Sequence, residues 1–119
     1  MSPTRDFTFV GDTVAGFLKT AECDRAIGQE INLGTGQEIS IGELANKIAA
    51  QVGRDIRVRQ SEERTRPKSS EVQRLLSNNC KAKEVLGWEP HKDLDEGLKE
   101  TVEWVRGRLA MYDPDSYRI

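Results

Sequence analysis

The sequence predicts one α/β domain over residues 1–119, with the element order βαβαβ followed by two helices and an irregular tail at 112–119. Three observations support this order: short stretches that alternate between apolar and polar residues, longer stretches with helical apolar spacing, and glycines where the two meet. A chain of 119 residues is long enough for one ordinary domain. With 36% hydrophobic and 32% charged residues, it is expected to fold around a modest core.

The N-terminal stretch predicts the first strand and the first helix. Residues 6–10 alternate and place Phe7 and Phe9 on one face, as in a half-buried strand. Asp12 is a suitable N-cap for the helix that follows. The apolar residues of this helix have helical spacing and comprise Val14, Phe17, Leu18 and Ala21.

The middle of the chain predicts a strand, a helix and a third strand. Residues 30–33 are expected to be the second strand. Ser40 and Glu43 form a capping box, in which each side chain accepts a hydrogen bond from a free backbone N–H of the other residue. The helix after it is predicted to end at Gly53, and its apolar stripe comprises Ile41, Leu44, Ala45, Ile48, Ala49 and Val52. Residues 56–59 alternate again and predict the third strand.

The C-terminal part predicts a long polar loop and two helices. Residues 60–78 have no apolar period, and loops of that length usually have a function. A short helix follows Asn79 and stops at Gly87, where a left-handed cap fits. The last helix begins with an acidic capping box of Asp93 and Glu96. Its apolar stripe comprises Leu94, Leu98, Val102, Val105 and Leu109.

Composition narrows the classes of function. The 18 basic and 20 acidic residues leave a net charge of −2, which does not favour a nucleic-acid or anionic-membrane partner. No stretch is apolar enough for a membrane span or a signal peptide, so a cytoplasmic location is expected. Cys23 and Cys80 stand alone and predict neither a zinc site nor a disulfide framework. Seven basic and four acidic residues in 54–74 make that segment a candidate anion site, net +3.

Two local patterns are compatible with ligand binding. The turn at residues 34–36 lies where a dinucleotide-binding loop would, but Ile39 occupies the third glycine position, which favours an ordinary turn. Arg5 and Arg66 would form a clamp for a diphosphate if they converged, because guanidinium groups bind phosphate bidentately. By spacing alone, a surface arginine or a structural ion pair explains each equally well. His91 has no nucleophile beside it and is expected to be a solvated loop residue.

Five motifs in one order carry a family resemblance. They are RDFTFVGDTV at 5–14, NLGTG with SIGEL at 32–44, RPKSSEV at 66–72, KAKEVLGWEP at 81–90 and LDEGL at 94–98. Together they resemble the C-terminal part of the extended short-chain dehydrogenase/reductase family, the NAD-dependent nucleotide-sugar epimerases and 4,6-dehydratases. The resemblance covers nearly all of the chain and is nearest to dehydratases that act on UDP-N-acetylhexosamines.

The resemblance implies a fold and a ligand. The fold would be a partial Rossmann-type sheet with elements of the small substrate-binding domain. Arg5 and Arg66 would contact the diphosphate of a UDP-sugar-like substrate, and Glu71 would bind its ribose hydroxyls. Complete members also have a glycine-rich NAD turn and a catalytic Tyr-x-x-x-Lys pair, neither of which this sequence contains. The chain alone is therefore expected to bind no NAD and to be inactive, as a truncated product, an excised domain or a remnant.

Two functions stay open at this stage. The first is weak, UDP-selective binding of a nucleotide sugar through Arg5 and Arg66. The second is a structural module without ligand binding, whose exposed surfaces lead to self-association or bind a missing N-terminal half. Open sheet edges favour an oligomer in either case. Nucleic-acid binding is the least supported, because no aromatic residue is interleaved with the basic segment.

Overall fold

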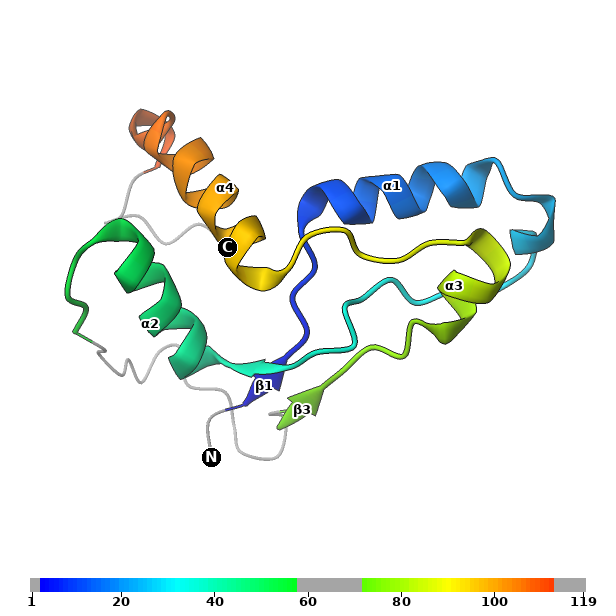
Figure 1. Ribbon diagram of the computed structural model, residues 1–119, viewed down its shortest axis with the longest axis horizontal. Coiled ribbons are helices and arrows are strands. Elements are labelled where there is room, and N and C mark those ends of the chain that lie inside the picture. The colour runs from blue at the N-terminus through cyan, green and yellow to red at the C-terminus, as the bar shows by residue number, and fades with distance from the viewer. Residues whose placement is uncertain (1–2, 58–71, 113–119) are drawn as a thin grey trace.

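The computed structural model describes residues 3–57 and 72–112, and within them the fold is mixed α/β (Figure 1). The elements are β1 (Thr4–Arg5), α1 (Val10–Ala21), β2 (Ile39–Ser40), α2 (Ile41–Val52), β3 (Arg74–Leu75), α3 (Cys80–Leu86) and α4 (Leu94–Arg106). Short 3-10 turns lie at Asp24–Ala26 and Leu109–Met111. The predicted α/β class and the order βαβαβ followed by two helices are confirmed.

The strands are short and lie elsewhere than the sequence predicts. The sheet order is β2-β1-β3, with Thr4 opposite Ser40 in an antiparallel pair and opposite Arg74 in a parallel pair. The expected strand at 6–10 is wrong, because β1 comes two residues earlier and α1 already begins at Val10. Pairing through the backbone, such as Thr4 N–H donating to the Gln73 carbonyl at 2.9 Å, determines these positions, and apolar alternation does not report it.

The other two expected strands are also corrected. Residues 30–33 have no strand partner within the described residues, although Ile31 and Leu33 pack against the core. Residues 54–57 are irregular, and 58–71 lie outside the described residues, as does most of the predicted tail. The third strand is β3, inside the predicted loop 60–78, where exposed side chains hide it from an apolar pattern.

Local capping signals predicted the helices well. Both capping boxes are present, with Ser40 accepting from the Glu43 N–H and Asp93 accepting from the Glu96 N–H. Gly53 ends α2 in the left-handed conformation at φ 72°. Two details are wrong: Phe9 takes the N-cap of α1 in place of Asp12, and α4 ends before Leu109.

The core is small and lies between α1, α3 and the turn that follows α1. The buried apolar residues of the described part are Ala26, Ala82, Leu86 and Trp88. Trp88 is 1% exposed, and its indole N–H donates to the Asp12 carbonyl at 2.9 Å, which joins the start of α1 to the end of α3. Asp12 is buried and accepts a second bond from the Lys92 N–H at 3.1 Å.

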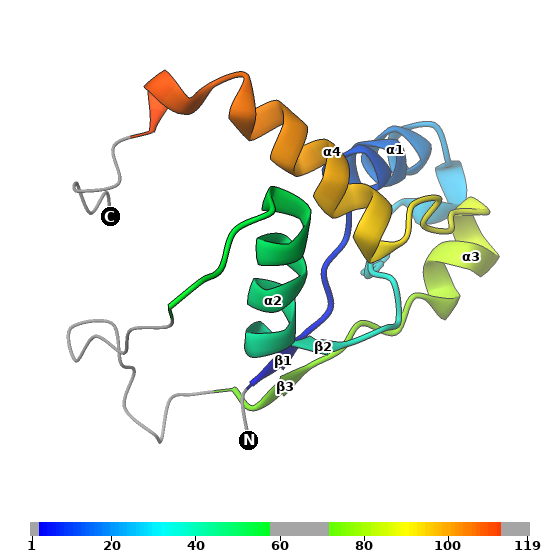
Figure 2. The same ribbon diagram turned by 60° about the vertical axis from the view of Figure 1, so that its left-hand side comes forward.

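A second layer consists of α2 and α4, which lie side by side above the sheet (Figures 1 and 2). Lys47 of α2 pairs with Asp95 of α4 at 2.7 Å, and Gln51 donates to the Asp95 carbonyl at 3.0 Å. None of the helices in residues 3–57 and 72–112 has the length and apolarity needed to cross a bilayer.

Candidate functional site: the centre of the sheet

The sheet positions Arg5, the one predicted site residue that the structure describes. Arg5 ends the central strand β1, opposite Ile39 on one side and Leu75 on the other. Its guanidinium donates to the Thr4 carbonyl at 2.8 Å, and the residue is half-buried. Strands on both sides therefore hold the backbone of this arginine.

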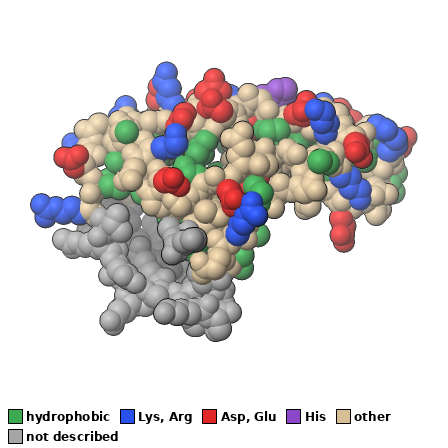
Figure 3. Space-filling view, turned by 60° about the horizontal axis from the view of Figure 1, so that its bottom comes forward, with side chains coloured by type: hydrophobic (Ala, Val, Ile, Leu, Met, Phe, Trp, Pro, Cys, Tyr) green, Lys and Arg blue, Asp and Glu red, His purple; other side chains and the backbone are tan. Residues whose placement is uncertain are grey.

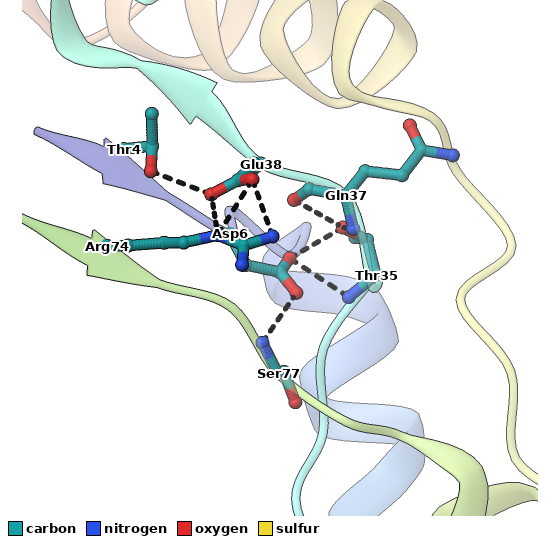
Figure 4. A network of polar contacts seen from close by, with 7 residues as sticks. All are labelled: Thr4, Asp6, Thr35, Gln37, Glu38, Arg74 and Ser77. Carbon is teal, nitrogen blue, oxygen red and sulfur yellow. Dashed lines mark hydrogen bonds and ion pairs between the residues drawn. The ribbon is translucent and has the colours of Figure 1, made fainter.

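Asp6 is the polar centre of this region (Figure 4). Its Oδ1 accepts from the Thr35 N–H at 3.0 Å and from the Thr35 hydroxyl at 2.5 Å. Its Oδ2 accepts from the Gly36 N–H at 2.9 Å and from the Ser77 N–H at 3.3 Å. One carboxylate thus ties the residue after Arg5 to two other segments of the chain.

These bonds decide how the glycine turn at 34–36 is used. The N–H groups of Thr35 and Gly36 already bind a carboxylate of the same chain, whereas a dinucleotide turn offers such groups to a phosphate. Gly34 is required by packing, since a Cβ there would lie 2.2 Å from the Ser77 Cβ, and Gly36 has φ +71°. The described residues therefore do not fit NAD at this turn, which supports the interpretation of an ordinary turn.

A second polar cluster joins the segment before β2 to β1 and β3. Glu38 accepts from Arg74 Nε at 2.9 and 2.8 Å, and from the Thr4 hydroxyl at 2.7 Å (Figure 4). The bond from Arg74 and then the bond from Thr4 hold the pKa of the Glu38 carboxyl below its ordinary value of 4.5. The same pair raises the pKa of Arg74. Arg74 is thus a structural cation engaged with its own sheet.

Sequence reasoning missed the roles of Asp6, Glu38 and Arg74. Asp6 belongs to the RDF motif, so its place beside Arg5 was a usable signal. Glu38 and Arg74 are 36 residues apart, and only the pairing of β3 with β1 brings them together. No spacing rule for a single element connects two such residues.

Arg66 and Glu71 lie outside the described residues, so their convergence with Arg5 stays a prediction. The chain returns to the described part at Val72. The next residue, Gln73, accepts the Thr4 N–H beside Arg5. After the segment that contains Arg66 and Glu71, the described chain therefore resumes beside the strand that carries Arg5.

A cleft of about 800 Å³ opens between residues 35–39, α2 and residues 90–95. It contains two lysines, but Lys47 is paired with Asp95 and Lys92 with Glu100, so neither offers an uncompensated charge. His91 lines this cleft and is exposed, as expected of a loop residue. The described residues hold no group of three potential metal ligands.

Charged side chains of both signs are interspersed over the face shown in Figure 3. Basic side chains do not gather into one area on the described part of that face.

Comparison with known proteins shows what the chain is similar to. The sequence profile described as GDP-mannose 4,6-dehydratase matches residues 1–101. A UDP-glucose 4-epimerase from Mycolicibacterium smegmatis is 39% identical over 107 residues, which are 90% of this chain and 33% of that protein.

Solved structures agree in fold. An epimerase from Methanothermobacter thermautotrophicus has 35% identity and a TM-score of 0.83, covering 92% of this chain and 32% of its own. A UDP-glucose 4-epimerase from Thermotoga maritima, solved with UDP-glucose, has 33% identity and a TM-score of 0.76, covering 91% of this chain and 33% of its own. The chain thus spans about a third of the length of the relatives it matches.

Proposed function

We propose, because this chain belongs to the family of NAD-dependent nucleotide-sugar epimerases and dehydratases, that it forms the nucleotide-sugar-binding part of such a protein. The family match over residues 1–101 is the observation that carries the proposal. The match includes the strand with Arg5, both polar clusters around it and the segment that contains Arg66 and Glu71. The ligand class is a UDP-sugar, as in the relative solved with UDP-glucose.

The chemistry of Arg5 suits a diphosphate. A guanidinium keeps its positive charge at every physiological pH and presents donors in a fork that matches phosphate oxygens. The central strand, with Asp6 bound to two further segments, holds the backbone of Arg5 in place before a ligand arrives. Arg66 would supply the second guanidinium, and Glu71 would accept hydrogen bonds from ribose hydroxyls.

The affinity of the chain alone is expected to be weak. Ligand pockets bury most of a ligand's surface, and the relatives have about two thirds of their length outside the matched region. We also propose that the chain alone binds no NAD and does not catalyse the family's reaction, since its glycine turn is engaged with Asp6 and the Tyr-x-x-x-Lys pair is missing from the sequence. A cytoplasmic location stays a prediction.

The second candidate is a structural module without a ligand that self-associates or binds another polypeptide. The observation that favours it is the exposure of large apolar side chains on α1, of which Phe17 is 67% exposed. The two functions are compatible, because the sheet with Arg5 and the outer side of α1 are different surfaces.

Titration with UDP and with a UDP-N-acetylhexosamine, followed by proton–nitrogen correlation NMR, tests the proposal. Saturable shifts of dispersed peaks are expected in the full chain. They should be lost in Arg5→Ala and Arg66→Ala and kept in Arg54→Ala, a matched arginine beyond the end of α2. Dispersed peaks that ignore both nucleotides would refute binding and leave the structural module. Equal loss in all three variants would mean that net charge, rather than a site, attracts the nucleotide.

A further inference from the structure

The end of helix α4 exposes side chains of the kinds that anchor protein interfaces. Trp104 is 49% exposed, and Arg108 lies over its ring with the guanidinium carbon 4.4 Å from the ring centre. The apolar side chains that follow are 62%, 68% and 51% exposed, and they are Leu109, Met111 and Tyr112. These five residues are the α4 end patch. Tryptophan, arginine, tyrosine and methionine are enriched in protein interfaces, and the first three carry much of the binding energy there.

The fold of the single chain does not account for Trp104. The side of α4 that packs inward has a different set of half-buried residues, which are Leu94, Leu98, Val102 and Val105. Within residues 3–57 and 72–112, the indole N–H of Trp104 has no hydrogen-bond acceptor, whereas that of Trp88 is bound in the core. Figures 1 and 2 show the end of α4 at the border of the molecule, with α2 along one side of it. Trp104 therefore lies on a second face of the helix, which the described chain leaves open.

The charges along α4 are arranged so that its two ends complement each other. Residues 94–103 contain four acidic side chains and one lysine, whereas residues 104–112 contain two arginines and no acidic side chain. In the described part of the chain, Lys92 bonds only the Oε1 of Glu100, which leaves Oε2 without a partner, and the Arg108 guanidinium has no carboxylate partner. Glu100 and Arg108 lie four residues before and four residues after Trp104. In two antiparallel helices that cross at Trp104, each of these charges would therefore oppose the other.

Gly107 leaves room for a large side chain from a neighbouring helix. A Cβ at this position would meet only the backbone of its own helix, at 3.7 and 3.9 Å. Its φ of −70° is ordinary, so the backbone conformation does not require a glycine. Helical side chains lean toward the N-terminus of their helix, so the Trp104 ring of an antiparallel partner would extend toward this glycine.

We propose that the α4 end patch binds a second copy of this chain, with the two α4 helices antiparallel and a two-fold axis at Trp104. The Trp104 ring of each copy lies over Gly107 of the other. Arg108 of each copy pairs with the free Oε2 of Glu100 in the other, so every contact occurs twice. A second copy fits the patch because the acidic group that Arg108 requires is present on α4 itself.

This contact is expected to be weak and separate from the ligand site. It involves neither Arg5 nor the exposed side chains of α1, so it is independent of nucleotide binding. One helix face makes a small interface, and the dissociation constant should be on the order of 100 µM. The chain is then a monomer at low micromolar concentration.

Light scattering and fluorine NMR of the full chain labelled with fluorotryptophan test the contact between about 10 µM and about 1 mM. The mean mass should rise with concentration from 13.4 kDa toward twice that value. The chain has two tryptophans, so two resonances are expected. Only the resonance that Trp104→Phe removes should move with concentration, because Trp88 is already buried.

Substitutions in the contact separate its parts. Trp104→Ala should weaken dimerisation about thirtyfold or more, as expected for the loss of an interface anchor. Gly107→Leu should also weaken it, because the added side chain occupies the space of the ring. Arg108→Glu and Glu100→Arg should each give a monomer, since like charges would then oppose each other. An equal mixture of these two variants should dimerise again, because every opposed pair then has unlike charges.

Two matched changes elsewhere should leave the dimer intact, and circular dichroism checks that every variant keeps its fold. Phe17→Ala removes an aromatic side chain that is 67% exposed on α1, and Arg54→Glu reverses the charge of an exposed arginine. A chain that stays monomeric at about 1 mM would overturn the proposal. So would a dimer that Phe17→Ala dissociates and Trp104→Ala does not, since the contact would then lie on α1. Stronger association of Gly107→Leu would indicate unspecific apolar contact, and a monomeric mixture of the two charge variants would exclude the antiparallel pairing.

Discussion

Replacing Trp88 with phenylalanine should destabilise the fold by about 1.5–3.5 kcal/mol. Two effects contribute to that loss. The Asp12 carbonyl loses its bond from the indole N–H, and a hydrogen bond of this kind contributes about 0.5–1.5 kcal/mol. The smaller ring also leaves a cavity beside Ala82 and Leu86, which adds about 1–2 kcal/mol. The core of the described residues contains only these buried apolar side chains and Ala26, so little can compensate.

Urea denaturation followed by far-ultraviolet circular dichroism measures this loss without relying on tryptophan fluorescence. Trp104→Phe is the matched control, because Trp104 is 49% exposed and contacts Arg108 on the surface. Its cost should stay below about 1 kcal/mol. A Trp88→Phe variant within about 0.5 kcal/mol of the parent, or a Trp104→Phe variant of equal cost, would refute the assignment of the core to Trp88.

Three further predictions concern the sheet and its turn. The pKa of Glu38 is lowered in the folded state, so the stability that its carboxylate contributes is present above the ordinary value of 4.5 and is lost as pH falls through the folded pKa. Glu38→Gln should therefore make the loss of folding stability with acid shallower. A plot of stability against pH that is unchanged in the variant would contradict this. Gly34→Ala should lower folding stability by about 1–3 kcal/mol, because the added methyl group overlaps Ser77. Gly42→Ala is the control, since open space surrounds Gly42, and it should be neutral or stabilising. Equal melting temperatures of the two variants would contradict the overlap. Ser40→Ala should cost about 1 kcal/mol through loss of the α2 cap, measured by urea denaturation, and a Ser40→Thr variant, whose hydroxyl can make the same bonds with Glu43, that fails to restore stability would count against capping.

Elements with local causes were predictable from the sequence. Capping of α2 by Ser40 and of α4 by Asp93 involves residues three positions apart, and the turn at Gly87 needs only a left-handed backbone. Strand positions were not predictable in this way. The three strands have two residues each, and their partners lie more than 30 residues away in the chain.

The candidate site divides in the same way. The RDF and Arg-Pro motifs pointed to Arg5 and Arg66, and the family match bears out the resemblance on which they rest. The four hydrogen bonds to the Asp6 carboxylate come from the turn at 34–36 and from Ser77. No pattern in the sequence showed that this carboxylate accepts hydrogen bonds from the N–H groups of the glycine turn.

The sequence by itself determined the α/β class, the order of the elements, the ends of α2 and the start of α4, and the family. These depend on neighbouring residues or on motifs in a given order. Tertiary structure alone decided which stripe of α1 faces outward, where the strands pair and which charges surround Arg5. The physical reason is that helical spacing marks an apolar face without saying what covers it, and backbone pairing between distant segments leaves no trace in side-chain periodicity.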